Sequence, residues 1–177
     1  MRSQDAMAER LFARFTKTGA PPRISEIPEG GFCISSFVVL NKKARPNEIL
    51  LGKIDTSAEW EHIGGLDKDR ALSNSKGWML PGCHLMYGES PQDAAKRILT
   101  EMLGMPDQKL QGPAVFSEVY GPKNHWDIEF LFTGERDDVR PHAVWKELRF
   151  VDTTKLQLAD FARNHQDVLA HLGKWKG

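Results

Sequence analysis

The sequence predicts an α+β or α/β fold in which helices cover a mixed β-sheet. Strand-like runs alternate along the chain with helix-like segments, an order typical of folds that layer helices on a sheet. A second observation is a strand, loop and helix in the middle of the chain whose start and stop signals are complete. A length of 177 residues with 40% hydrophobic content suits one globular core. We therefore expect residues 1–177 to form a single domain.

The central helix is predicted to begin at Pro91. Ser90 is a good N-cap, Pro91 fits the first helical position because its missing N–H is not needed there, and Asp93 stands where a capping-box acid would sit. Gly104 and Pro106 then supply the usual stop, which places the end near Leu103. The apolar positions repeat with a helical period: Ala94, Ala95, Ile98, Leu99, Met102 and Leu103.

The rest of the chain supplies further strands and a closing helix. Two hairpins are predicted from runs rich in β-branched and aromatic residues, the first with a turn over residues 41–47. Their strands are Phe32–Leu40 with Glu48–Ile54, and Ala114–Tyr120 with Trp126–Thr133. A last strand is expected at Val144–Val151 and a closing helix at Leu156–Leu172.

The stretch from Gly77 to Met105 carries a spaced motif. Its residues are Gly88, Glu89, Ala94, Ala95, Arg97, Leu99, Glu101, Gly104 and Met105, preceded by Trp78, Leu80, Pro81 and Gly82 of the strand leading into it. This motif resembles the Nudix box of the Nudix hydrolase superfamily, whose pattern is a glycine, five residues, a glutamate, seven residues, then Arg-Glu-apolar-any-Glu-Glu-any-Gly-apolar. The resemblance implies the Nudix, or MutT-like, fold: a mixed β-sheet sandwiched between helices.

The box is nevertheless degenerate. In active family members three helix glutamates hold divalent metal against a diphosphate, and the matching positions here are Ile98, Glu101 and Met102. Cys83 replaces the opening glycine. Mg²⁺ prefers hard oxygen ligands in octahedral array, so one helix carboxylate is a poor site.

The helical period places Ile98 and Met102 inside one continuous apolar arc, with Glu101 just outside it. This face is either packed against the domain or left open toward a pocket. We favour packing, because Ile98 and Met102 continue the arc without a break.

The resemblance also assigns candidate site residues. Glu101 would be the principal metal ligand or base, and Glu89 and Glu129 would complete the metal shell, with Glu118 a further acid from the same region. Glu89 has a structural alternative, since a carboxylate is favoured near a helix N-terminus. Glu129 shares a strand face with Asp127, where acids are usually solvent-facing.

Three residues are candidates for substrate binding. Arg97 matches the family arginine that orients the carboxylates, and it can pair with Glu101 four residues later. Tyr120 and Trp126 could stack on a base, although aromatic residues in such strands are more often part of the core.

Two functions remain open on the sequence. The first is a catalytically depleted Nudix-like domain that binds a nucleotide or related phosphate ligand without a cofactor. The alternative is a hydrolase of a nucleoside diphosphate linked to another moiety, in which Mg²⁺ or Mn²⁺ bridges phosphate oxygens and a base activates water.

Composition excludes several other classes. Lys plus Arg equals Asp plus Glu at 24 each, so no charged field favours nucleic acid or a membrane surface. The six histidines lack the short spacings of a zinc site, and Cys83 and His84, being adjacent on a strand, should point to opposite faces. Two cysteines and no signal-type or membrane-spanning segment favour a reduced, cytoplasmic protein.

Two segments lie outside the resemblance. Residues 5–17 predict an amphipathic helix with Met7, Leu11, Phe12 and Phe15 on one face, which either packs on the domain or forms a homodimer contact. Residues 55–76 form a polar insertion before the box. It either covers the site or is a surface excursion with Trp60 in the core.

Overall fold

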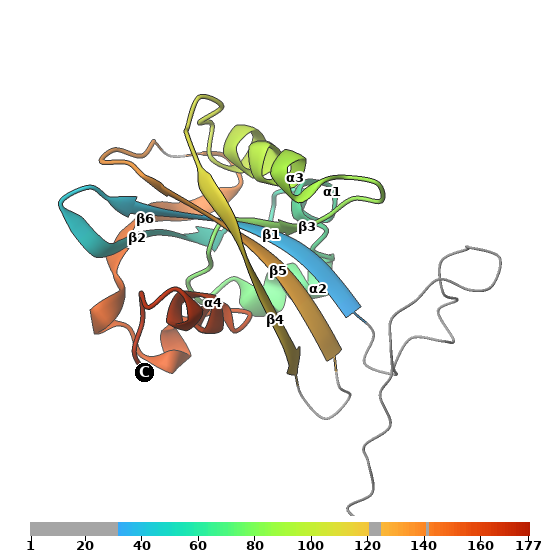
Figure 1. Ribbon diagram of the computed structural model, residues 1–177. Helices are drawn as coiled ribbons and strands as arrows, with labels where there is room; N and C mark the ends of the chain where they lie inside the picture. The colour runs from blue at the N-terminus through green and yellow to red at the C-terminus, as the bar shows by residue number, and fades with distance from the viewer. Residues whose placement is uncertain (1–31, 121–124, 141) are drawn as a thin grey trace, which may run out of the picture.

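The computed structural model describes residues 32–120, 125–140 and 142–177 (Figure 1). The helix predicted at residues 5–17 lies outside this part of the chain. The strands are β1 (Phe32–Lys42), β2 (Arg45–Ile54), β3 (Gly82–His84), β4 (Gln111–Tyr120), β5 (His125–Glu135) and β6 (Trp145–Asp152). The helices are α1 (Trp60–Gly64), α2 (Lys68–Asn74), α3 (Pro91–Arg97) and α4 (His165–His171), with a π-helical turn η2 (Ile98–Met102) and two 3₁₀ turns, η3 (Thr153–Lys155) and η4 (Leu158–Asp160). Among the described residues, no helix combines the length and the apolar character needed to cross a membrane.

The strands form one mixed sheet in the order β4-β5-β1-β2-β6, with β3 pairing to β1 beside this path. Strands β1 and β5 are parallel, whereas the other pairs are antiparallel. Both predicted hairpins are confirmed. The first turn is shorter than expected, because β1 and β2 continue into residues 41–47 and leave only Lys43 and Ala44 between them.

Each face of the sheet carries its own hydrophobic core. On the face covered by α3, buried residues such as Val38, Leu50 and Phe132 pack against the helix. On the face covered by α4, Phe37, Val39 and Leu131 pack against Val168 and Leu169. We call these the α3 face and the α4 face. The alternation of side chains along β1 and β5 produces both, and the predicted sheet between helices is confirmed.

The box helix begins and ends where the sequence predicts. The Ser90 hydroxyl accepts from the backbone N–H of Asp93 at 3.1 Å, and Gly104 adopts a left-handed φ of 62° after the last turn. The last turn is wider than an α-helix: the N–H of Leu103 donates to the carbonyl of Ile98, five residues back, at 3.2 Å. The apolar arc is nevertheless buried, because the helix faces the sheet along its whole length.

The insertion at residues 55–76 is not structureless. It contains α1 and α2, and Gly65 ends α1 in a left-handed conformation. Trp60 is 2% exposed and meets Trp145 edge-to-face, with ring centroids 5.0 Å apart. The expectation that Trp60 enters the core is confirmed.

The predicted closing helix at Leu156–Leu172 is wrong in its first half. Residues before α4 instead run beside the strand-like backbone of Trp78, whose N–H donates to Asp160 and whose carbonyl accepts from Ala162. Arg163 and Asn164 then take left-handed φ values of 58° and 56°, which no α-helix can contain. The helix therefore starts only at His165.

Candidate functional site

The helix face that matches the box glutamates is closed. Ile98 and Met102 are 0% and 1% exposed. A Cβ added to Gly64 in α1 would lie 3.2 Å from the Met102 Cε, so the insertion packs directly over this side chain. The Trp145 indole N–H donates to the Met102 carbonyl at 2.8 Å. The expected packing of this face is confirmed, and the alternative of an open greasy face is excluded.

Arg97 holds three segments together at the start of this face. Its Nε and Nη2 both donate to the Glu89 carboxylate at 2.8 Å, its Nη1 donates to the Ile63 carbonyl at 2.7 Å, and its Nη2 also reaches the His84 carbonyl at 3.1 Å. The predicted pairing of Arg97 with Glu101 is therefore wrong. The guanidinium turns toward the loop before the helix, where two backbone carbonyls and a carboxylate converge.

Glu89 is committed to this arrangement. Its side chain is 7% exposed and also accepts from the Met86 N–H at 2.9 Å. The hydrogen bonds from Arg97 hold the pKa of Glu89 below its usual value, against the opposing effect of burial. Both carboxylate oxygens are occupied, which supports its structural alternative.

The three predicted metal ligands do not come together. Glu101 is exposed, and no hydrogen bond or ion pair joins it to another residue of the described part of the chain. Glu129 projects from the α4 face, so the sheet separates it from the box helix. Nowhere in residues 32–120, 125–140 and 142–177 do three His, Cys, Asp or Glu side chains group to hold a metal ion. A buried isoleucine and methionine with one exposed carboxylate do not fit Mg²⁺.

Glu129 instead belongs to a polar region on the α4 face. It is 8% exposed, which corrects the expectation that this acid faces solvent, and its Oε2 has no hydrogen-bond partner among the described residues. Burial, together with the charge of Asp127, raises the pKa of Glu129 to about 7. A desolvated acid with an unused oxygen is typical of functional sites.

Arg163 lies in the same region and contacts His84. Its Nη2 is 3.1 Å from the His84 Nε2. Because a guanidinium can only donate, that imidazole nitrogen must be an unprotonated acceptor. Burial, together with the charges of Arg163 and Arg70, lowers the pKa of His84 to about 4.

Arg163 has no carboxylate within ion-pair distance in the part of the chain that the structure describes. Burial lowers the pKa of its guanidinium, and Arg70 does the same, whereas Asp127 and Glu129 are near enough to oppose them. Arg163 and Asn164 both have left-handed φ values, which is uncommon for residues other than glycine. Strained backbone of this kind is often retained where it positions a functional side chain.

These groups form what we call the Arg163 cluster. Cys33 and Ser35 also belong to it; they lie at the beginning of β1, where the Cys33 Sγ is 3.3 Å from the Ser35 hydroxyl. Burial raises the pKa of the Cys33 thiol, so it stays protonated at neutral pH. The cluster comprises Cys33, Ser35, His84, Asp127, Glu129 and Arg163. It has a cationic end at Arg163 and an acidic end at Asp127 and Glu129.

Of the two aromatic residues predicted to stack on a base, Tyr120 shares a sheet face with this cluster and Trp126 does not. Tyr120 is paired with His125, two residues before Asp127. Burial raises the pKa of Tyr120, and the charge of nearby Glu129 contributes to the same shift. Trp126 projects from the α3 face, where its indole N–H donates to the Ser117 hydroxyl at 2.9 Å. The two therefore cannot hold one base between them.

Sequence reasoning missed Arg163, because it lay inside a segment predicted to be helical. It considered His84 only as a partner of Cys83, and those two side chains do point to opposite faces: Cys83 is buried near the carbonyl of Ala94, while His84 contacts Arg163. The cluster is recognised only in three dimensions, where β3 lies beside the turn before α4.

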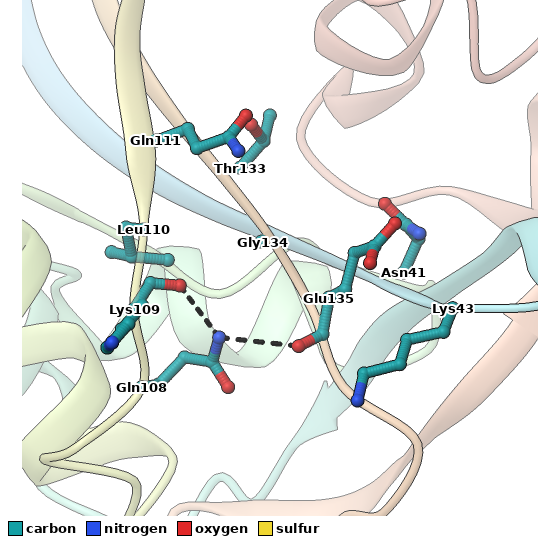
Figure 2. A pocket seen from close by; sticks show the side chains of 9 residues that line it. All are labelled: Asn41, Lys43, Gln108, Lys109, Leu110, Gln111, Thr133, Gly134 and Glu135. Atoms are coloured by element: carbon teal, nitrogen blue, oxygen red, sulfur yellow. Dashed lines mark hydrogen bonds between the residues drawn. The ribbon is translucent and has the colours of Figure 1, made fainter.

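A separate hollow of about 370 Å³ opens at the far end of β1 and β5 (Figure 2). It is lined by Asn41, Lys43, residues 108–111 and residues 133–135. The Gln108 amide donates to the carbonyls of Lys109 and Glu135 at 2.8 and 3.4 Å, so its donors are already used by backbone. We therefore place the candidate site at the Arg163 cluster and not in this hollow.

No model of a known protein family matches the sequence, and no curated protein is similar to it in sequence. Solved structures are similar in fold. The MutT protein from Methanosarcina mazei Go1 superposes with a TM-score of 0.57 at 16% identity, over 81% of this chain and 94% of that one. Two others have lower TM-scores of 0.46: a MutT/nudix family protein from Enterococcus faecalis (15% identity, 70% of this chain and 45% of that one) and the E. coli dihydroneopterin triphosphate pyrophosphohydrolase (14% identity, 72% and 83%). The chain therefore has the mixed-sheet fold of the MutT/Nudix proteins.

Proposed function

We propose that this chain binds a phosphate-bearing small molecule, a nucleotide or a related derivative, at the Arg163 cluster. On this proposal the chain binds its ligand without the divalent metal that the Nudix resemblance implies. The observation that carries the proposal is Arg163, a half-buried guanidinium with an unprotonated histidine nitrogen 3.1 Å away and no carboxylate partner among the described residues.

An unpaired, partly buried cation costs stability, so its retention needs a reason. A phosphate supplies one, because its oxygens accept the parallel N–H groups of a guanidinium in a bidentate arrangement. His84 uses one of the donors of Arg163 and fixes its direction. Arg70, close enough to lower the pKa of both residues, adds positive charge at the same end.

The acidic end of the cluster favours a ligand that is more than phosphate. The Glu129 Oε2 is buried without a partner and can accept a hydrogen bond, or donate one when protonated. The amino, imino or hydroxyl groups of a base or sugar have this complementary chemistry. A ligand with phosphate at Arg163 and such a group at Glu129 would satisfy both ends.

The same groups explain why hydrolysis is not the function we propose. Glu101 is exposed, Glu89 is fully engaged by Arg97, and Ile98 and Met102 form core. Metal-assisted attack of water requires carboxylates arranged around a metal beside the phosphates. The alternative, a metal-dependent hydrolase, would need acids that the described residues do not bring together.

The proposal is tested by calorimetric titration with a panel of nucleoside diphosphate derivatives, once in EDTA and once in Mg²⁺, with chromatography of each mixture for product. We expect binding of at least one ligand with the same affinity in both buffers, and no product. Binding that needs Mg²⁺, or release of a nucleotide product, would overturn the proposal in favour of the hydrolase.

A matched pair of variants locates the site. Arg163→Gln should weaken binding at least tenfold, because it removes the charge and the bidentate donors but keeps a polar side chain. Arg45→Gln removes an arginine whose side chain is 62% exposed, at the start of β2, and should leave affinity unchanged. Equal affinity of the two variants would place the ligand elsewhere.

A further inference from the structure

An apolar surface is exposed on the α3 face, at the end where β1 and β5 begin and β4 ends. The strand register places Phe32, Trp126 and Val119 side by side across three strands. Val115 lies on the same face of β4, opposite Phe130. Phe32, Val115 and Val119 are 49%, 55% and 56% exposed. We call Phe32, Val115, Val119 and Trp126 the apolar row.

The box helix does not reach this row. It meets β1 at Ser36, whose hydroxyl donates to the Pro91 carbonyl at 3.1 Å, and the strand residues before Ser36 extend past it. Figure 1 shows the ends of β1, β4 and β5 projecting beyond α3. Within the described residues β4 is an edge strand. Contiguous apolar side chains on an exposed edge usually mark a surface that something covers.

We propose that residues 5–17 of the same chain dock on the apolar row. This segment has a complementary need, since Met7, Leu11, Phe12 and Phe15 form an apolar stripe at helical spacing that must also be buried. The chain enters β1 at Phe32, which is itself a member of the row. The apolar row and the apolar stripe of residues 5–17 therefore belong to the same chain, and the segment that connects them enters the sheet at the row itself.

The connection is long enough. The fourteen residues 18–31 reach on the order of 45 Å when extended, more than the width of the three strands at about 4.8 Å each. Tethering by a linker of this length gives an effective concentration in the millimolar range. Even a weak apolar contact would then be occupied within one chain at concentrations where two copies stay apart.

Cysteine cross-linking in the full chain tests the docking. In a Cys33→Ser background, Leu11→Cys with Val119→Cys should form an intramolecular disulfide under mild oxidation, seen as a faster-migrating monomer on a non-reducing gel. Ala13→Cys with Val119→Cys places the first thiol about 200° around the helix from Leu11, on the side away from the apolar stripe, and should cross-link at least tenfold more slowly. Equal rates for the two pairs, or no cross-link in either, would overturn the proposal.

The dependence of cross-linking on protein concentration distinguishes residues 5–17 of the same chain from a second copy as the occupant of the row. An intramolecular bond forms at a rate independent of protein concentration, whereas cross-linked dimers that increase with concentration would assign the row to a second copy and overturn docking within one chain. Hydrogen exchange gives an independent measurement. Amides of residues 5–17 should be protected at least tenfold in the native chain and lose that protection in Val119→Asp, and an unprotected segment in the native chain would contradict the proposal.

Discussion

The two faces of the sheet differ in the side chains that they bury at their candidate sites. On the α3 face, two of the three positions that match the metal-binding glutamates of the Nudix box, Ile98 and Met102, are hydrophobic and buried, and α1 packs over Met102. On the α4 face, Glu129 is buried with one oxygen that has no hydrogen-bond partner among the described residues, and Arg163 is half-buried without a carboxylate partner there. Apolar replacement stabilises a core, whereas unsatisfied polar groups reduce stability. This difference supports our proposal that a ligand binds on the α4 face, and the following variants test the comparison.

The largest effect is expected from Ile98→Glu combined with Met102→Glu, which restores the box acids. Truncating each buried side chain costs about 2–5 kcal/mol, and each new carboxylate must also be neutralised or paired inside the core. A domain with about 5–15 kcal/mol of stability would be unfolded or nearly so. Thermal melting with and without Mg²⁺ measures this. A folded variant whose melting temperature rises with metal would show that the face is an emptied metal site.

Arg97→Gln should cost about 3–5 kcal/mol, because it leaves the Glu89 charge nearly buried without its partner. The backbone carbonyls of Ile63 and His84 lose their donor as well. Lys96→Gln is the control, since its pair with Asp93 is largely exposed and worth at most about 1 kcal/mol. Urea unfolding of the two variants gives the comparison, and equal midpoints would contradict the structural role of Arg97.

The ion pair between Glu89 and Arg97 also predicts that the stability of the chain falls at acid pH. The folded-state pKa of Glu89 is lowered from 4.5, so its contribution is present above the unfolded pKa and is lost as pH falls through the folded pKa. Arg97→Gln should therefore flatten the loss of stability below pH 4.5.

The sequence predicts the sheet, both hairpins, the box helix and the burial of Ile98 and Met102, because each depends on local periodicity and turn signals. It fails between Leu156 and Asn164, where backbone pairing with Trp78 overrides helical spacing. It also fails at Arg97, whose helical spacing to Glu101 is correct but whose partners lie in loops brought close by the fold. The Arg163 cluster joins β1, β3, β5 and the turn before α4, and no local pattern encodes such a meeting.

Glu129→Gln should abolish a pH dependence of stability of intermediate size. The folded pKa of Glu129 is about 7 and its unfolded value 4.5, so the folded state binds the extra proton between these values and stability falls as pH rises through the window. The loss is on the order of 3 kcal/mol, at about 1.4 kcal/mol per pH unit. The glutamine variant should lack this slope and be more stable than the native chain above pH 7. Denaturant midpoints at pH 5, 6, 7 and 8 give the slope.

Glu118→Gln is the control for that slope. Glu118 is exposed on the same sheet face, opposite Asp127, and its charge is the last of the effects that raise the pKa of Glu129. Glu118→Gln should therefore keep most of the pH dependence of the native chain. If the slope persists in Glu129→Gln but disappears in Glu118→Gln, the titrating group is Glu118 and not Glu129. The raised pKa of Glu129 would then no longer support a site on the α4 face.

The smallest effect is expected from Glu101→Gln, the one helix position where the sequence keeps a box glutamate. Its side chain is exposed and contacts no described residue through a hydrogen bond or ion pair, so stability should change by less than about 0.5 kcal/mol. Ligand affinity in EDTA should also be unchanged, because the Arg163 cluster lies across the sheet from this helix. The substitution keeps shape and removes only charge, which makes it the most selective probe of the box. If the native chain released product in Mg²⁺ and Glu101→Gln did not, this single carboxylate would be an essential acid, and the α3 face would be an active site built with fewer acids than the box prescribes.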